Sequence, residues 1–287
     1  MDLFIQLIVN GISNGSYYAL LAIGFGLIFG TTGIAHFAYG PIFALSAYIM
    51  WALATWFGFP FWLAVGGGIV AGGLLGAGSY LLVYEPFLER GSPPFVVLVA
   101  SLGLLIVVSN LLGIFFGTDV KVLNDLQYNI YFLGDAAISS VQISQGVVFL
   151  LVVVALGAFL KYTSYGNAIR AVTDNVEMAR VVGIDTRSIS VGVFAIGSMI
   201  AAIPAAHVLA RDGVSTGVGF VAVFYAFAAM AVGGVGSIMG AAIGGLLIGM
   251  IESVGMWKLP TEWQSSIAFI VLFVVLLWRP TGVLRGS

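Results

Sequence analysis

The chain has 287 residues, of which 61% are hydrophobic and only 8% are charged, with a mean hydropathy of +1.12. A soluble domain carries about 25% charged residues, so this composition excludes an ordinary soluble protein. The net charge of −2 says little about partners, and no basic run suggests nucleic acid. The absence of cysteine excludes disulfides and zinc–thiolate sites.

Long uncharged runs divide the sequence and predict membrane-spanning helices. A span needs about 20 apolar residues, and the runs supply eight or nine such segments within a single transmembrane domain, residues 1–287. The runs are continuous rather than alternating, which argues against a β-barrel. We therefore expect an all-α, polytopic bundle with spans at 5–29, 36–57, 61–84, 93–116, a fifth ending at Leu160, 188–209 and 263–278, and two apolar pieces within 213–257.

The first span is expected to be retained and not cleaved as a signal peptide, because its apolar run lacks the preceding basic residues of a secretory signal. Breaks are predicted at residues 30–33 and 58–60, which contain glycine and proline. Residues 117–141 are predicted to form the longest irregular segment. The apolar piece near 220–232 is short for a full crossing, so a broken or re-entrant helix is expected there.

Glycine-rich breaks at Gly30–Gly40 and Gly233–Ser237, one in each half of the sequence, are each expected to interrupt a helix. Interrupted helices in two halves of a chain are typical of a transport path near the middle of the membrane. The alternative is ordinary close packing of helices, for which glycines four residues apart are typical, as at 68–76 and 236–249. The candidate hinge glycines are Gly30, Gly33, Gly40, Gly233, Gly234 and Gly236.

Lysine and arginine are unevenly distributed over the predicted loops. The loops at 85–92, 161–187 and 279–287 carry seven of the ten basic residues. Cytoplasmic loops carry such an excess, so these loops and the C-terminus are predicted to lie in the cytoplasm.

The segment 163–187 is the most polar part of the sequence and is predicted to form two short helices. Asp174, followed by Glu177, has the pattern of a capping box, and Gly183 stands where a left-handed C-cap belongs. Thr163 or Ser164 is expected to cap the first helix. The second helix places Met178, Val181 and Val182 on one face, which fits either the bilayer surface or a groove on a soluble partner.

Polar side chains within the spans are candidates for a translocation path. Asn10 and Asn14 recur at helical spacing in the first span, where contact with other helices is the alternative to solute contact. His36 lies beside the first break, and neither it nor His207 has the companion ligands of a metal site. Glu252 fits an interfacial anchor, a polar contact at a helix end, or the path. Asn110 carries the same ambiguity as Asn10 and Asn14.

Three groups of residues together resemble a known family. These are Asn10-Gly11, Gly15-Ser16, Tyr18-Ala19-Leu20 and Gly33-Ile34; Gly166-Asn167-Ala168-Ile169-Arg170-Ala171-Val172 and Gly183-Ile184; and Gly233-Gly234-Val235-Gly236-Ser237, Gly240-Ala241 and Gly244-Gly245. Their order and spacing resemble the permease subunits of bacterial ABC importers for branched-chain amino acids, over nearly the whole chain.

The resemblance implies a multi-pass protein of the bacterial inner membrane without enzymatic activity of its own. Its partners would be a second homologous permease, two ATPase subunits, an extracytoplasmic solute-binding protein and membrane lipid. The chain has no Gly-x-x-x-x-Gly-Lys sequence, so ATP and magnesium would be bound by the ATPase subunits. The resemblance also favours docking of segment 163–187 on the ATPase, through Gly166, Ala168, Arg170, Ala171, Asn175, Glu177, Met178, Ala179, Val182 and Gly183.

Departures from the family pattern leave the identity of the solute undetermined. The family usually reads Asn-Phe-Ala-His-Gly where this chain has His36-Phe37-Ala38-Tyr39-Gly40, so His36 and Tyr39 join the candidate path residues. Branched-chain amino acids or similar zwitterions are expected, with urea, short amides or aromatic carboxylates as alternatives. An uncoupled channel is a rival of a different class. A membrane-embedded enzyme is disfavoured because no cluster of His, Asp or Glu lies within the spans.

Overall fold

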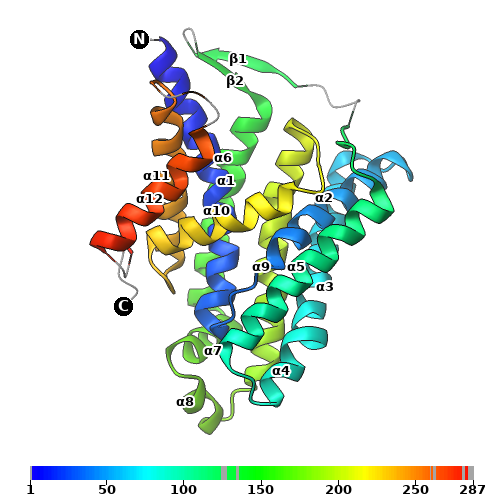
Figure 1. Cartoon of the computed structure of the whole chain (residues 1–287), viewed down its shortest axis with the longest axis vertical. Helices are drawn as coiled ribbons and strands as arrows, with labels where there is room; N and C mark the ends of the chain where they lie inside the picture. The colour runs from blue at the N-terminus through cyan, green and yellow to red at the C-terminus, as the bar shows by residue number, and fades with distance from the viewer. Residues whose placement is uncertain are drawn as a thin grey trace.

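The computed structural model describes residues 2–123, 128–133, 136–258, 260, 263–279 and 282–283. Long helices run along one axis of the molecule, as the continuous apolar runs predicted (Figure 1). The helices are α1 (Asp2–Thr32), α2 (Tyr39–Thr55), α3 (Phe61–Ser79), α4 (Glu85–Glu89), α5 (Pro94–Phe116), α6 (Ser140–Tyr162), α7 (Ser164–Asp174), α8 (Val176–Val181), α9 (Thr186–Arg211), α10 (Val218–Gly233), α11 (Ile238–Gly255) and α12 (Gln264–Trp278).

Six stretches of helix are long and apolar enough to cross a membrane, and three shorter apolar helices accompany them among the described residues. The six are α1, α5, α6, α9, α11 and the rod Phe61–Glu89. In this rod a π-helical turn, η1 (Tyr80–Tyr84), joins α3 to α4. The short helices are α2, α10 and Ser266–Trp278, so the expected eight or nine segments include these shorter pieces.

The polar segments gather at two opposite ends of the bundle. α4, α7 and α8 lie at one end, which we call the α8 end, and the N-terminus lies at the other (Figure 1). We call this other end the outer end, because the distribution of basic residues predicts that it faces away from the cytoplasm. The outer end also carries an antiparallel hairpin of β1 (Ile130–Leu133) and β2 (Ala136–Ser139). The prediction of an irregular segment at 117–141 is therefore wrong for this hairpin, whose strands pair from Ile130 with Ser139 to Leu133 with Ala136.

Both glycine-rich breaks, Gly30–Gly40 and Gly233–Ser237, occur, although the first begins later than Gly30. α1 continues through Gly30 to Thr32, and the chain turns at Gly33, where φ is +69°. The second break separates α10 from α11 at Gly234 and Gly236, which have φ values of +114° and +83°. α10 has only 16 residues and lies across the long helices (Figure 1), as expected for a broken helix.

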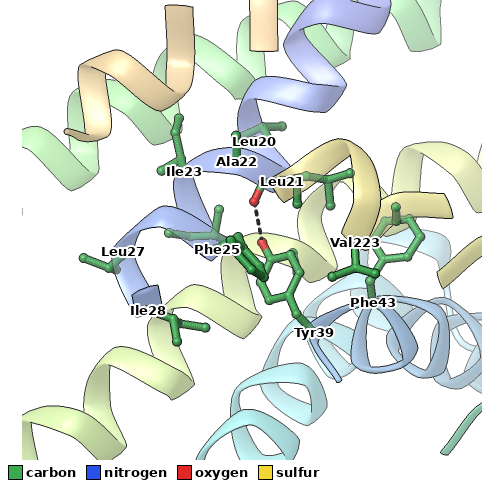
Figure 2. Close-up of a cluster of buried hydrophobic side chains, with 14 of the residues drawn as sticks. Leu20, Leu21, Ala22, Ile23, Phe25, Leu27, Ile28, Tyr39, Phe43 and Val223 are labelled. Carbon is green, nitrogen blue, oxygen red and sulfur yellow. Dashed lines mark hydrogen bonds between the residues drawn. The ribbon is translucent and has the colours of Figure 1, made fainter. Parts of the chain in front are cut away.

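The core forms around α1, which packs most extensively against α11. Glycines allow this approach: a Cβ at Gly245 would lie 2.2 Å from the backbone nitrogen of Ala19, and one at Gly249 would lie 2.2 Å from that of Gly15. Figure 2 shows the adjoining cluster, in which the Tyr39 ring of α2 points into the apolar side chains of α1. Lipid is as apolar as the helix surfaces, so the hydrophobic effect does not hold helices together in the membrane, and close packing stabilises the bundle instead.

Candidate functional site

The segment after α6 forms two capped helices at the α8 end. The Thr163 hydroxyl accepts a hydrogen bond from the Gly166 backbone N–H at 2.9 Å and caps α7 as expected. The predicted cap of the second helix is wrong by one residue, because Asp174 is the last residue of α7. Asn175 caps α8 instead, and its Oδ1 accepts from the Met178 N–H at 2.9 Å.

Gly183 ends α8 as expected. Its φ of +86° belongs to the left-handed region, and the Ile184 N–H returns to the Ala179 carbonyl at 2.9 Å. Two caps around a helix of six residues matter because so short a helix is unstable alone. α8 is therefore held in one shape by three residues, Asn175, Gly183 and Ile184.

The apolar face of α8 points away from the bundle. Met178, Val181 and Val182 are 59%, 78% and 71% exposed, whereas Ala179 is buried against the protein. Ala179 is therefore an internal contact of this chain, and a part for it in docking stays a prediction. Gly166 is also internal, since a Cβ there would meet the backbone of Phe159 and Leu160. The other predicted coupling residues are exposed or half-buried: Ala168, Arg170, Ala171, Asn175, Glu177 and Gly183.

α7 connects this surface to both breaks. The Thr173 hydroxyl lies 3.1 Å from that of Thr31, at the end of α1. Gly30 and Gly236, one from each predicted break, meet so closely that a Cβ on Gly30 would lie 3.1 Å from the Gly236 Cα. A cavity of about 200 Å³ has Gly30, Asp174 and Gly236 in its wall. α7 therefore lies beside both breaks.

A larger polar cavity lies between α8 and the rod Phe61–Glu89. It encloses about 510 Å³, and its wall includes Glu85, Glu89, Arg180 and Arg187. Arg180 Nε donates to the Thr186 hydroxyl at 3.2 Å, which holds α8 to the start of α9. Burial raises the pKa of the nearby Tyr165 hydroxyl, and the Asp185 carboxylate adds to this rise. The hydroxyl therefore stays protonated and donates to the Ser188 carbonyl at 3.0 Å.

The other candidate hinge glycines serve close contacts. A Cβ at Gly40 would lie 2.1 Å from the Gly219 carbonyl oxygen, and one at Gly233 would lie 1.9 Å from that of Gly240. These two glycines thus bring α2 against α10 and α10 against α11. Positive φ values occur at Gly33, Gly234 and Gly236, which are the candidates where the chain turns.

The candidate path residues lie in four places, of which that of Glu252 is described below. Asn10 and Asn14 share a pocket of about 260 Å³ at the outer end, together with Leu7, Gln142, Arg211, Ser253, Met256 and Gln264. His36 and Tyr39 are fully buried, and the Tyr39 hydroxyl donates to the Leu21 carbonyl at 3.0 Å (Figure 2). Asn110 is exposed on α5 and bonds its own helix at the Ile106 carbonyl, so the structure does not bring it to the others.

Glu252 is fully buried in the last turn of α11, so the interpretation as an interfacial anchor is wrong. Its Oε1 accepts from the Tyr225 hydroxyl at 3.2 Å, and the Tyr225 ring stacks on Tyr18 at 4.1 Å. The carboxyl group thus makes a polar contact at a helix end, which was the second interpretation. Within the described residues, no group of three His, Cys, Asp or Glu side chains forms a metal site.

Sequence reasoning missed Gln142, Arg211 and Gln264, which line the outer pocket. A local signal existed for Gln142, because Ser139 and Gln142 form a reciprocal capping box at the start of α6. Arg211 was visible only as an isolated basic residue at the end of a span.

Comparison with known proteins settles the family. Residues 7–276 match the family described as branched-chain amino acid transport system / permease component. This chain belongs to that family. The high-affinity branched-chain amino acid transport system permease protein LivH of Escherichia coli strain K12 is 32% identical over 98% of this chain and 95% of its own. The corresponding protein BraD of Pseudomonas aeruginosa is 31% identical over the same shares.

Membership of the family makes this chain a transport permease and not an enzyme. With its six long apolar helices, it is a multi-pass membrane protein. A similar fold occurs in a chain of PsaBC from Streptococcus pneumoniae in complex with Fab, with a TM-score of 0.52 at 14% identity, covering 95% of this chain and 91% of that one.

Proposed function

We propose that the chain is the permease subunit of an ATP-driven importer of the bacterial inner membrane, and that it carries branched-chain amino acids or similar small zwitterions. The names of its relatives support this solute class. The proposed partners are a second homologous permease, two ATPase subunits that bind ATP and magnesium, and an extracytoplasmic solute-binding protein. The α8 end and the C-terminus would face the cytoplasm, in line with the basic residues of the 85–92 and 161–187 loops.

The exposed apolar face of α8 carries the proposal. Burying a valine or methionine side chain contributes about 1.5–3 kcal/mol relative to leaving it exposed. Met178, Val181 and Val182 are held in one shape by caps on both sides, yet none of them packs on the bundle. An apolar face of three side chains, already folded at the end of a polytopic bundle, fits a groove on a soluble subunit.

The coupling path follows from the contacts of α7. Closure of the ATPase subunits would displace α8 and α7 together, since Asn175 joins them directly. The Thr31–Thr173 contact and the Gly30–Gly236 approach would pass this displacement to the two breaks. Helices interrupted at glycines are suited to such rocking because the turns absorb the change in backbone angle.

The test places a charge on the exposed face. Val181→Asp should abolish retention of the ATPase subunits on the purified permease and remove ATP-driven uptake of leucine. Val122→Asp is the matched control, since Val122 is 49% exposed at the outer end and should leave both unchanged. Normal retention and uptake in Val181→Asp would contradict the proposal and favour a helix that contacts only lipid.

A further inference from the structure

The outer pocket contains a group of hydrogen-bond donors that the coupling mechanism does not use. It lies where α1, α6, α9, α11 and α12 meet, far from α8, and encloses about 260 Å³. That volume admits a small solute with some water. Five helices from distant parts of the sequence thus contribute to one small polar space inside an apolar bundle.

The hydrogen bonds within the pocket use the acceptor oxygens of its two asparagines. Asn10 Oδ1 already accepts from the Nε2 atoms of Gln6, at 3.1 Å, and Gln142, at 3.2 Å. Asn14 Oδ1 has a long contact of 3.5 Å with Arg211 Nη1. The acceptor oxygens of both asparagines are therefore engaged, whereas no hydrogen bond from either Nδ2 to another described residue occurs.

Arg211 contributes a guanidinium group to the pocket. Its Nε and Nη2 bind Asp212 Oδ2 at 2.9 and 2.7 Å, which leaves Nη1 directed at Asn14. A carboxylate accepts hydrogen bonds only, and it is the anion that a guanidinium with amide donors holds best. Because Asp212 balances Arg211, the pair presents no net charge, which suits a solute that is itself a zwitterion.

Leu7 and Met256 give the same pocket an apolar part. Methionine is unbranched and flexible, so it adapts to aliphatic groups of different shape. A donor group for a carboxylate beside an adaptable apolar surface corresponds to the two ends of an aliphatic amino acid.

We propose that this outer pocket receives the solute on entry, with Arg211 and the amides of Asn10 and Asn14 holding the α-carboxylate of an aliphatic amino acid. The inference rests on the proposed function for its solute class, and it adds a recognition site within the permease itself. The carboxylate is held by one guanidinium group, whose charge Asp212 balances, and by two neutral amide donors, so binding is weak and release toward the spans is easy.

The absence of cysteine in the chain makes the site testable by thiol labelling. Met256→Cys, in the assembled importer in proteoliposomes, places a reactive group on the apolar part of the pocket. L-leucine should slow its labelling by a membrane-impermeant maleimide several-fold, whereas leucinamide, which lacks the carboxylate, and urea should not. Lys258→Cys, in the same turn but exposed, is the matched control and should show no protection.

Combining Met256→Cys with Arg211→Gln should remove protection by leucine and leave the labelling rate without solute unchanged. Arg211→Lys should restore only part of the protection. The positive charge remains, but the planar guanidinium group with its paired N–H donors is lost. Equal protection by leucinamide would overturn the role of the carboxylate. Protection by the solute-free binding protein alone would identify a protein-docking contact and overturn the site.

The outcomes separate this inference from the proposed function. ATP-driven leucine uptake without any protection by leucine would overturn the outer site and leave the importer function standing. Uptake of urea in place of leucine, with protection by urea, would overturn both the solute class and the carboxylate contact. Retention of the ATPase subunits is unaffected by either result, because α8 lies at the other end.

Discussion

Glu85 and Arg187, 102 residues apart in sequence, form a two-pronged ion pair between the start of α4 and the first turn of α9. Arg187 Nη2 lies 2.9 Å from Glu85 Oε2, and Arg187 Nε binds Oε1. The Glu85 side chain is 11% exposed and that of Arg187 is 66% exposed. Because α9 follows α8 closely, the pair attaches the base of the proposed coupling segment to the rod that contains the π-helical turn.

The unequal burial of this pair predicts an unequal response to mutation. Arg187→Gln leaves a buried carboxylate without its cation, whereas Glu85→Gln leaves an arginine that water can reach. Arg187→Gln should therefore lower the Tm of the detergent-purified protein more than Glu85→Gln does. Arg90→Gln, at an exposed arginine of the same end, is the control and should leave the Tm unchanged. Equal losses for Arg187→Gln and Glu85→Gln would contradict this reading of the pair.

A buried hydroxyl network around the first break gives a second prediction. The Tyr84 hydroxyl lies 2.7 Å from His36 Nδ1 and donates to the Ser101 hydroxyl at 3.0 Å, and Ser101 accepts from the Phe37 N–H. Tyr84→Phe should cost about 1–3 kcal/mol of unfolding free energy, because buried partners lose their hydrogen bonds.

Tyr48→Phe is the matched control for Tyr84→Phe. The Tyr48 hydroxyl is buried and has no hydrogen-bond partner in the described part of the chain, so its removal should be neutral or slightly stabilising. Denaturant unfolding in mixed micelles measures both variants. Similar losses in the two would show that the hydrogen-bond network does not account for the effect.

Close packing of α1 on α11 predicts a penalty for single methyl groups. Gly245→Ala and Gly249→Ala should each destabilise the fold by about 1–3 kcal/mol, because the added Cβ meets backbone that cannot yield. Gly103→Ala in α5, where a Cβ meets nothing within 4 Å, should be neutral or stabilise by up to about 1 kcal/mol through helix propensity. Thermal unfolding of the three variants distinguishes packing from propensity; the idea fails if Gly103→Ala is as harmful as the other two.

The cap of α8 predicts opposite behaviour for two neighbouring residues. Asn175→Ala removes the side chain that accepts from Met178 and should cost about 1 kcal/mol of local helix stability. Hydrogen exchange at residues 178–181 should therefore become faster. Asp174→Ala should leave that exchange rate unchanged, since Asp174 ends α7. Faster exchange in Asp174→Ala alone would show that Asp174 caps α8, as the sequence predicted, and that Asn175 does not.

Local patterns account for what the sequence predicted correctly. Uncharged runs of sufficient length located the spans, because a helix needs only its own residues to satisfy its backbone in lipid. The breaks at Gly33 and Gly236 and the stop at Gly183 were predictable from glycine, which enters the left-handed region without strain. The cap residue was missed by one position, since Asp174 and Asn175 both carry suitable side chains.

The sequence by itself therefore determined the all-helical membrane architecture, the positions of the breaks and the two short helices of segment 163–187. Only the tertiary structure decided which faces are buried: Ala179 packs inward, Glu252 is enclosed, Asn110 faces outward, and Arg211 joins Asn10 and Asn14 in one pocket. The physical reason is that helices apolar on every side carry no periodic signal for their orientation. Lipid and protein interior are equally apolar, so packing and pairing between distant segments choose the faces.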